Sequence, residues 1–455
     1  MVRAGQLDFI HSGYAGRSAA RLVMLLVFLG LSACQSVTVP DEPPATAQQM
    51  VHREGVPHTD AQGNLRRAYD PARSFFPIGA YHALHGEAFG QKHDLALFKQ
   101  AGFNTVHLWP VQNIDAALDA AERLGLQAIV ENPDETLARR RWQSPAILAW
   151  MLENEAAQFV SDADTPARLA VFDQTLARFR SFDPGRASLI VDGAGLAPIY
   201  YQRWAAWREK ADISALFNYP FFRRADPVQH IERVARTMSR AVRLTEGKKP
   251  VWYISQAFAD TRMGWYMPDA EQLRATIYTA LVHGATGVIH FSYDSHGTRD
   301  GDVLGYSPSP IADYGDVPDY DNSKKPALVA TPQQLRQSQA MWRQVVALNH
   351  ELALVGPSML QPTADLACTV KADGPYRRSQ PIRLIVKPAD NGDLLLIAVN
   401  IEDMALNVDI TCDRVIATLV PFLPVAMPEM TLAEPNLIRD RFTPFGVRLY
   451  RLRLA

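Results

Sequence analysis

The stretch Ile147-Leu148-Ala149-Trp150-Met151-Leu152-Glu153-Asn154-Glu155 decides which fold this chain is expected to have. Its first six residues are apolar, and a short continuous apolar run is typical of a strand that is buried on both faces of a sheet. The run ends abruptly in two carboxylates and an amide. Because a parallel α/β barrel carries its chemistry at the carboxyl ends of its strands, Asn154 and Glu155 are predicted to lie in a functional site. The alternative is a helix start with acidic residues near its positive end.

Seven further strand-like runs surround this stretch and alternate with helical segments. The eight predicted strands span residues 75–81, 104–109, 127–131, 147–153, 187–192, 213–218, 250–256 and 287–293. Strands that alternate with helices predict a parallel sheet, and eight such units predict a (β/α)8 or TIM barrel, here over residues 71–357. A doubly wound open sheet is the alternative. It is less favoured because no Gly-x-Gly-x-x-Gly turn follows any strand.

The first 70 residues are predicted to be a targeting segment and a tether. Arg17 and Arg21 precede the apolar run 22–30, which is too short to span a bilayer as a mature helix. The next residues, Leu31-Ser32-Ala33-Cys34, resemble the bacterial lipobox, whose cysteine is lipidated. Residues 1–34 are therefore expected to be a lipoprotein signal peptide, and residues 35–70, rich in Pro, Thr, Ala and Gln, a flexible tether. An ordinary secretory signal with a chance cysteine is the alternative.

Composition and charge are those of a globular protein with a large core. The chain has 455 residues, of which 47% are apolar and 21% charged, so more than one folded unit is expected. Its net charge of −2, without a long basic run, argues against nucleic acid as a partner. Gln35 follows the lipobox cysteine, which by resemblance to bacterial lipoproteins favours a lipid anchor in the outer membrane, facing the periplasm or the cell surface.

Residues 358–455 differ in pattern, because they show no long helical period. Two apolar runs, residues 382–386 and 394–400, flank Asp390-Asn391-Gly392-Asp393, which is a hairpin signal. Further short runs predict a small antiparallel β-sandwich, which we expect to be an accessory domain. With Cys34 assigned to lipidation, only Cys368 and Cys412 remain. An exported compartment permits disulfides, so these two cysteines are expected to be bridged.

Polar and aromatic side chains follow every predicted barrel strand. In a barrel these strand ends converge on one mouth, although any one of these residues alone would more often cap a helix or pack. Apolar faces beside polar groups suit sugars, whose rings present C–H faces and hydroxyl edges. Trp150 and Trp252 lie mid-strand and are expected in the core. The residues expected to bind an oligo- or polysaccharide are Tyr81, His82, His107, Trp109, Glu131, Asn154, Asp192, Asn218, Tyr219, Gln256, Trp265 and Tyr293.

On these residues, the segment from about 74 to 355 resembles the clan A glycoside hydrolases. In that clan the acid/base glutamate follows an asparagine at the end of the fourth strand, as Glu155 follows Asn154 here. The resemblance implies that Glu155 is a general acid and that Tyr219 lies beside the nucleophile. The clan's nucleophile is a glutamate that ends the seventh strand, where this chain has Gln256. A neutral amide cannot attack an anomeric carbon, so a covalent intermediate at this position is excluded.

Two hydrolytic mechanisms remain open. An inverting hydrolase would use Glu155 as the acid and Asp294, Asp192 or Glu131 to activate water, with the two carboxyl groups about 6.5–9.5 Å apart. A substrate-assisted hydrolase would pair Glu155 with Glu153, since residues two apart in an extended strand project to the same side. That pairing resembles the acidic pair of chitinase-like barrels, and Asn218 or Tyr219 would then steady the cyclised intermediate.

Two other possibilities are less favoured. One is a carbohydrate-binding protein that has lost turnover. The other is metal chemistry, because the chain has no His-Glu-x-x-His and because His82 and His107 are isolated in the sequence. The sequence thus predicts hydrolysis of a glycosidic bond without a cofactor or a metal. Asn154 is expected to bind a sugar hydroxyl, and Gln256 to bind substrate or to position water.

Overall fold

The computed structural model describes most of the chain from residue 75 onward. The described residues are 75–88, 91–110, 112–193, 198–223, 226–245, 249–260, 262–293, 296–297, 302–310, 317–318, 324–325, 330–361, 363–423 and 432–455. The predicted signal peptide, the tether, Cys34 and Asp294 lie outside them. None of the helices within these ranges is long and apolar enough to cross a membrane.

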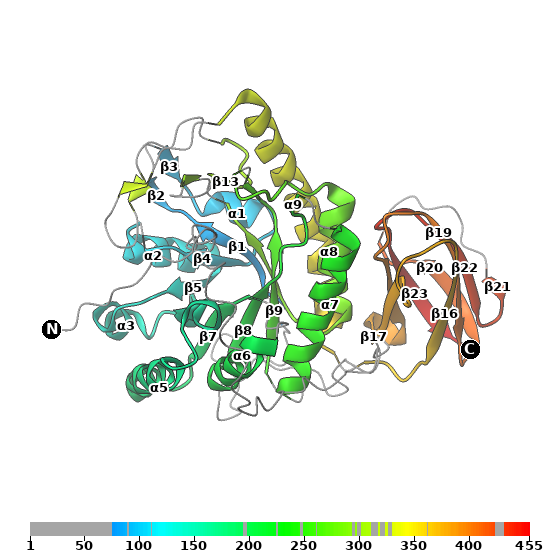
Figure 1. The fold of residues 1–455 in the computed structure, drawn as a ribbon, viewed down its shortest axis with the longest axis horizontal. Coiled ribbons are helices and arrows are strands. Elements are labelled where there is room, and N and C mark those ends of the chain that lie inside the picture. Colours follow the sequence, from blue (N-terminus) through cyan, green and yellow to red (C-terminus); the bar gives the residue numbers. More distant parts are fainter. Residues whose placement is uncertain are drawn as a thin grey trace, which may run out of the picture.

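The centre of the fold is a closed barrel of eight parallel strands (Figure 1). Each strand pairs with its neighbours in parallel register. The eight predicted strands therefore exist, and the predicted TIM barrel is confirmed. In chain order the barrel strands are β1 (Ile78–Ala83), β4 (Thr105–Leu108), β5 (Gln127–Glu131), β6 (Ile147–Asn154), β7 (Ala187–Asp192), β8 (Ile213–Phe217), β9 (Val251–Gln256) and β11 (Val288–Phe291).

Helices follow the strands and surround the barrel (Figure 1). Asn113 accepts a hydrogen bond from the backbone N–H of Ala116 and so begins α2, and Gly125 ends this helix in a left-handed conformation that glycine adopts without strain. The helices are α1 (Ala96–Gln100), α2 (Ile114–Leu124), α3 (Glu135–Arg141), α4 (Ala156–Phe159), α5 (Thr165–Phe182), α6 (Pro198–Lys210), α7 (Pro227–Leu244), α8 (Ala270–Val282) and α9 (Pro332–Met359).

Short strands decorate the connections between these elements. The hairpin of β2 (Gly86–Ala88) and β3 (Gln91–His93) follows β1. After β9, β10 (Ala259–Asp260) pairs with β13 (Asp302–Leu304), which also pairs with β12 (His296–Gly297). The connections after the seventh and eighth barrel strands are therefore hydrogen-bonded to each other. A separate pair is formed by β14 (Val317–Pro318) and β15 (Lys324–Lys325).

The barrel interior is a packed apolar core rather than a channel. Met151, Leu189 and Trp252 point inward from β6, β7 and β9 and are buried together. Trp150 points outward instead, and its indole N–H donates to Asp183 over 3.1 Å. Both Trp150 and Trp252 thus lie in the core, as their mid-strand positions predict. With the interior filled, only the strand ends can present groups to a ligand.

The C-terminal part forms two antiparallel four-stranded sheets, which confirms the predicted small β domain after the barrel. One sheet has the order β16 (Cys368–Asp373), β19 (Leu406–Cys412), β22 (Leu437–Phe442), β21 (Leu432–Glu434). The other has the order β17 (Ile382–Pro388), β18 (Leu394–Asn400), β23 (Val447–Leu454), β20 (Ile416–Pro421). The 3-10 turn η2 (Asp390–Gly392) joins β17 to β18, with Asn391 and Gly392 both at positive φ.

The β17–β18–β23–β20 sheet shares its core with the barrel. Leu396 and Tyr450 on one face pack against the other sheet. Ile397 and Leu449 on the opposite face belong to the same core as helix α8. A sheet that is buried on both faces explains why β18 reads as a continuous apolar run. It also explains why α8 is buried without interruption from Ala275 to Val282, since this helix has the barrel on one side and the sheet on the other.

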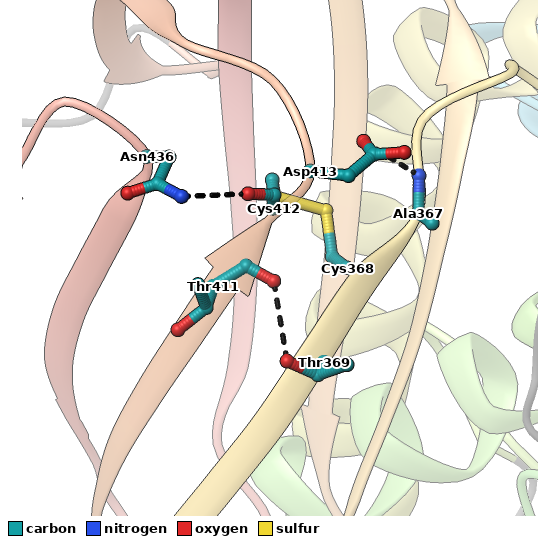
Figure 2. Close-up of a disulfide and its surroundings, with 7 residues drawn as sticks. All are labelled: Ala367, Cys368, Thr369, Thr411, Cys412, Asp413 and Asn436. Atoms are coloured by element: carbon teal, nitrogen blue, oxygen red, sulfur yellow. Dashed lines mark hydrogen bonds between the residues drawn. A yellow bond between two sulfur atoms is a disulfide. The ribbon is translucent and has the colours of Figure 1, made fainter.

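A disulfide joins Cys368 at the start of β16 to Cys412 at the end of β19 (Figure 2). The two cysteines face each other in the strand register, and their Cα atoms are 4.0 Å apart. Thr369 donates to the backbone oxygen of Thr411 beside this bridge. β16 is an edge strand that pairs only with β19, so it has hydrogen bonds on one side alone. The disulfide is an additional link that holds this strand against the sheet.

The double variant C368S/C412S is expected to lower the free energy of unfolding of the β domain by about 2–4 kcal/mol, since the bridge closes a long loop. The two cysteines are 44 residues apart in sequence. All eight tryptophans lie between Trp109 and Trp342, so tryptophan fluorescence follows the barrel, whereas far-ultraviolet circular dichroism follows both parts. Urea unfolding observed by both methods should show an earlier dichroism transition in the variant. Identical midpoints for variant and wild type would contradict this expectation.

Candidate active site at the carboxyl end of the barrel

The end of β6 contains one extra residue. In the pairing with β7, Met151 lies opposite Leu189, and Glu153, not Leu152, lies opposite Ile190. This bulge reverses the inward and outward alternation for the rest of the strand. Asn154 consequently pairs with Val191, whose side chain points into the barrel. The side-chain oxygen of Asn154 is buried and has no hydrogen-bond partner, which suits the predicted role of binding a hydroxyl.

Glu155 follows directly and occupies the rim of the barrel. Its backbone is left-handed, with φ 54°, and it begins the short helix α4. Its backbone N–H donates to the carbonyl oxygen of Val191 over 2.8 Å, which ties it to the end of β7. The residue is partly exposed.

The pKa of Glu155 is raised to about 8. The largest cause is burial, which disfavours the charged form, followed by the negative charges of Asp192 and Glu131. Glu155 therefore carries a proton at neutral pH. A carboxylic acid that is protonated at neutral pH and placed at the mouth of a barrel can act as a general acid.

Asp192, at the end of β7, is held on the outer side of the barrel wall. Its carboxylate accepts from the backbone N–H groups of Ala157 and Gly193, so it caps α4 just after Glu155. The buried Arg208 guanidinium lies 3.6 Å from the same carboxylate. Burial raises the pKa of Asp192 to about 6, although Arg208 and the two backbone N–H groups act in the opposite direction. Asp192 thus holds the start of α4 in position and raises the pKa of Glu155 through its charge. The expectation that it binds sugar is wrong for this geometry, because its carboxylate is buried and already bonded.

Aromatic rings form one side of the mouth. Tyr219 stacks on Phe217, with ring centroids 5.0 Å apart, and meets Phe258 edge-on at 4.9 Å. Phe291 lies 5.9 Å and the partly exposed Trp265 6.4 Å from Tyr219. Burial, and then the charge of Glu155, raise the pKa of Tyr219 well above its ordinary value, so its hydroxyl keeps its proton near Glu155. Tyr219 and Trp265 are therefore brought together as predicted.

Two further ring pairs form the other side. Tyr81 stacks on His107 at 3.9 Å, and His82 stacks on Trp109 at 4.3 Å. The Nε2 atom of His107 lies 3.3 Å from a carboxylate oxygen of Glu131, which points inward from the end of β5. These five residues come from the neighbouring strands β1, β4 and β5. His82 and His107, 25 positions apart in sequence, are thus neighbours in space.

The backbone around this mouth is locally strained. His82, Asn132 and Glu155 adopt positive φ angles of 57°, 43° and 54°. They are three of the five non-glycine residues of the described chain that do so, and they lie at the ends of β1, β5 and β6. Such conformations are uncommon for residues other than glycine, although histidine and asparagine adopt them more readily than most, and they concentrate at functional sites. The strain therefore marks the same end of the barrel as the side chains do.

Glu153 does not lie beside Glu155. The bulge turns it outward, where Arg168 on α5 donates to both of its carboxylate oxygens over 2.8 and 3.1 Å. Glu153 is almost fully buried in this pair. Residues two apart share a side only in a regular strand, and the bulge removes that regularity here. The catalytic role predicted for Glu153 is therefore wrong for this structure.

Gln256 lies at the end of β9, and its side-chain amide is occupied by backbone groups. Its oxygen accepts from the N–H of Phe221 over 2.9 Å, and its nitrogen donates to the carbonyl oxygens of Phe221 and Tyr266 over 3.1 and 3.0 Å. Both N–H bonds are used. The expectation that this amide binds substrate or positions water is therefore wrong, because the amide joins the two loops that follow β8 and β9.

Tyr293 and Asn218, which were also predicted to bind substrate, lie in different surroundings. Tyr293 packs outward among Phe98, Tyr306 and Trp342, which places it in the layer between barrel and helices rather than in the mouth. Asn218 is partly exposed at the end of β8, and its backbone oxygen accepts from Tyr253. Phe217, Phe258 and Phe291 were missed in the sequence. For Phe217 the available signal was its spacing of two from Tyr219, which places both on one face of an extended segment.

Comparisons with known proteins give only distant likenesses. No family model matches the chain, and no curated protein matches it. A Bacteroides fragilis protein with the provisional name α-galactosidase/melibiase is 10% identical, with a TM-score of 0.45, over 83% of this chain and 79% of that one. A β-galactosidase from the psychrophilic Marinomonas ef1 is 12% identical, with a TM-score of 0.42, over 62% and 60%. A GH2 β-galacturonidase from Eisenbergiella tayi is 14% identical, with a TM-score of 0.40, over 62% and 52%.

All three of these structures are named as glycosidases. Likenesses this distant carry no weight for the chemistry of the present chain. The barrel itself is established by the strand pairing described above. The chemistry has to be argued from the residues at the mouth.

The variant E155Q is expected to be more stable than the wild type at alkaline pH. Because the pKa of Glu155 is about 8 when folded and 4.5 in its ordinary state, the folded chain holds a proton that the unfolded chain releases between these values. Stability contributed by this group is therefore lost as the pH rises through 8. Glutamine removes the loss, so E155Q should gain about 4 kcal/mol at pH 9 relative to its difference at pH 5.

Thermal unfolding of both proteins at pH 5 and pH 9 checks this expectation. E122Q, which replaces an exposed glutamate on α2, is the matched control, and its melting temperature should stay close to that of the wild type at both pH values. A melting temperature difference for E155Q that is the same at both pH values would show that Glu155 does not hold a proton in the folded chain.

Proposed function

We propose that this protein is a glycoside hydrolase that acts on an oligo- or polysaccharide, with Glu155 as the proton donor. One observation carries the proposal: a partly exposed glutamate at the end of the fourth barrel strand has a pKa of about 8, and its charge acts on Tyr219. An acid that is protonated at neutral pH is what a departing sugar oxygen requires. The partly exposed residues Tyr219 and Trp265 would supply apolar ring faces for sugars.

The surrounding residues support distinct roles in a single displacement. Asn154 presents an unsatisfied oxygen toward the barrel interior, where a sugar hydroxyl can donate to it. Glu131 is the described carboxylate that faces the same interior, and it is the proposed group that acts on water. Gln256 carries no charge and its amide is occupied, so a covalent intermediate at that position has no nucleophile. Inversion at the anomeric carbon is therefore the proposed outcome.

The proposed setting is the cell envelope. The lipobox-like sequence ending at Cys34 would anchor the chain in the outer membrane, and residues 35–70 would tether the barrel to it. Anchoring confines the enzyme to glycans on the periplasmic side or at the cell surface. The β domain, which shares a core with α8, would act as an accessory packing domain rather than a second catalytic unit.

Activity measurements on a glycan panel test the proposal. The purified wild type should release sugars from at least one glycan, and E155Q should lose about 10²- to 10⁴-fold in kcat, the usual contribution of a general acid. Because the acid must be protonated, kcat of the wild type should fall as the pH rises above about 8. Proton NMR of the first product reports whether the anomeric configuration is inverted.

Matched variants make the result specific. E122Q removes an exposed glutamate on α2 and should retain activity. E153Q removes the carboxylate paired with Arg168, and a folded E153Q with full activity would exclude substrate assistance by this residue. Cleavage that is undiminished in E155Q would refute the assignment of the acid.

Binding without turnover is the second candidate function, and the occupied amide of Gln256 favours it. In that case wild type and E155Q would both retain a glycan of the panel, measured by calorimetry, and neither would cleave it.

A further inference from the structure

A second group of side chains at the mouth joins Glu131, which the proposed hydrolysis uses, to two histidines that it does not use. His82 lies near the end of β1, His107 within β4, and Glu131 at the end of β5. These strands are consecutive in the barrel wall. One ligand atom from each residue, two imidazole nitrogens and one carboxylate oxygen, lies within 4.8 Å of the other two.

We propose that His82, His107 and Glu131 bind a divalent transition-metal ion such as Zn²⁺. Two histidines and one glutamate are a ligand set of zinc sites that keep a fourth position open for water or substrate. Imidazole nitrogen suits zinc, copper, iron and nickel, whereas magnesium and calcium prefer oxygen ligands throughout. The donor set therefore selects the class of ion.

The distances between the three ligand atoms are close to those of a site with an ion bound. Two ligands of a tetrahedral zinc ion lie about 3.4 Å apart when each is about 2.1 Å from the metal. The Nε2 atom of His107 and the carboxylate oxygen of Glu131 are 3.3 Å apart, so this pair already has that separation. Only the third ligand, at up to 4.8 Å, has to move inward, by roughly 1 Å.

The surroundings hold the three side chains in place. His82, His107 and Glu131 are 7%, 1% and 3% exposed. Tyr81 stacks on the ring of His107, and Trp109 stacks on the ring of His82. Ligands whose rings are locked by packing lose little freedom when an ion binds.

The sulfur of Met151 lies 3.3 Å from the Nε2 atom of His107, beside the proposed position of the ion. A soft thioether next to imidazole nitrogen is compatible with late transition metals and adds nothing for magnesium or calcium.

The same atoms have another use, since the imidazole of His107 can hydrogen-bond to Glu131 with no ion between them. The other ring nitrogen, Nδ1, lies 3.4 Å from the backbone N–H of His82, which is long for a hydrogen bond and leaves either ring nitrogen able to carry the proton. Measured ion binding distinguishes the two uses.

Metal binding to the full chain tests the proposal. All proteins carry C34S, which removes the cysteine outside the disulfide, and no polyhistidine tag is present. After equilibrium dialysis against Zn²⁺ and mass spectrometry of the metal, one ion per chain is expected. E131Q and H107Q should each weaken Zn²⁺ binding at least tenfold. With Co²⁺ as the probe, the visible absorption should show four- or five-coordination in the wild type and be lost in both variants.

The control is H85Q, which removes a neighbouring, partly exposed histidine outside the group and should bind Zn²⁺ as the wild type does. H82N provides a third ligand variant, because asparagine tolerates the left-handed backbone at this position. Thermal unfolding shows which variants are folded, and only those are compared.

A wild type that takes up no Zn²⁺ at 100-fold excess, or E131Q, H107Q and H82N that all bind it undiminished, would overturn the proposal. No glycan enters these measurements, so their failure leaves the proposed hydrolysis untouched, and the reverse also holds.

Discussion

The geometry of the candidate site depends on one extra residue in the fourth barrel strand. The bulge at Leu152 sends Glu153 outward to Arg168 and turns Asn154 inward opposite Val191. A regular strand would place Glu153 inward instead, where a buried carboxylate would have lost its arginine partner. The bulge also delivers the chain to the left-handed turn at Glu155, which begins α4. Asp192 then accepts from the N–H of Ala157 in that helix, so the neighbouring strand holds the turn in position.

This arrangement concentrates negative charge where little water can screen it. The negative charges of Asp192 and Glu131 raise the pKa of Glu155, and of the described residues Arg208 is the cation that lowers the pKa of Asp192. The result is a proton on Glu155, whose pKa is about 8, and a lower pKa, about 6, for Asp192. A difference of this kind between the pKa values of two carboxyl groups is typical of a site in which one of them donates a proton. It also destabilises the folded chain at alkaline pH, which is a common property of functional sites. A cation at Glu131 would reduce the same repulsion, so the proposed hydrolysis and the proposed metal binding would both depend on this concentration of charge.

The barrel could be predicted because each strand is a separate apolar run and each helix has its own period. The carboxyl-terminal β domain could also be predicted, from the hairpin at Asp390–Gly392 and from the absence of a helical period after residue 358. The site was only partly predictable. Periodicity assigns a side chain to the inner or outer face only while the strand stays regular, and it failed for Glu153, where a bulge adds a residue. It could not show that Tyr293 packs outward among Phe98 and Trp342. Nor can spacing show that His82, His107 and Glu131 meet, since separations along the chain do not fix how the side chains of three neighbouring strands are oriented.

The presence of Gln256 instead of the expected glutamate has a structural consequence as well as a chemical one. Its amide binds the backbone at Phe221 and Tyr266, and these two loops carry Tyr219 and Trp265. A glutamate at this position could accept from the N–H of Phe221, but it would have no donor when ionised and a single O–H when protonated, so it could not serve both carbonyl oxygens. An ionised glutamate there would also add a further negative charge near Glu155. Glutamine therefore suits a barrel that keeps its aromatic side ordered and adds no further charge beside Glu131 and the protonated Glu155. The substitution removes covalent catalysis, but it does not by itself remove the acid, the hydroxyl acceptor or the aromatic surface that a single displacement requires.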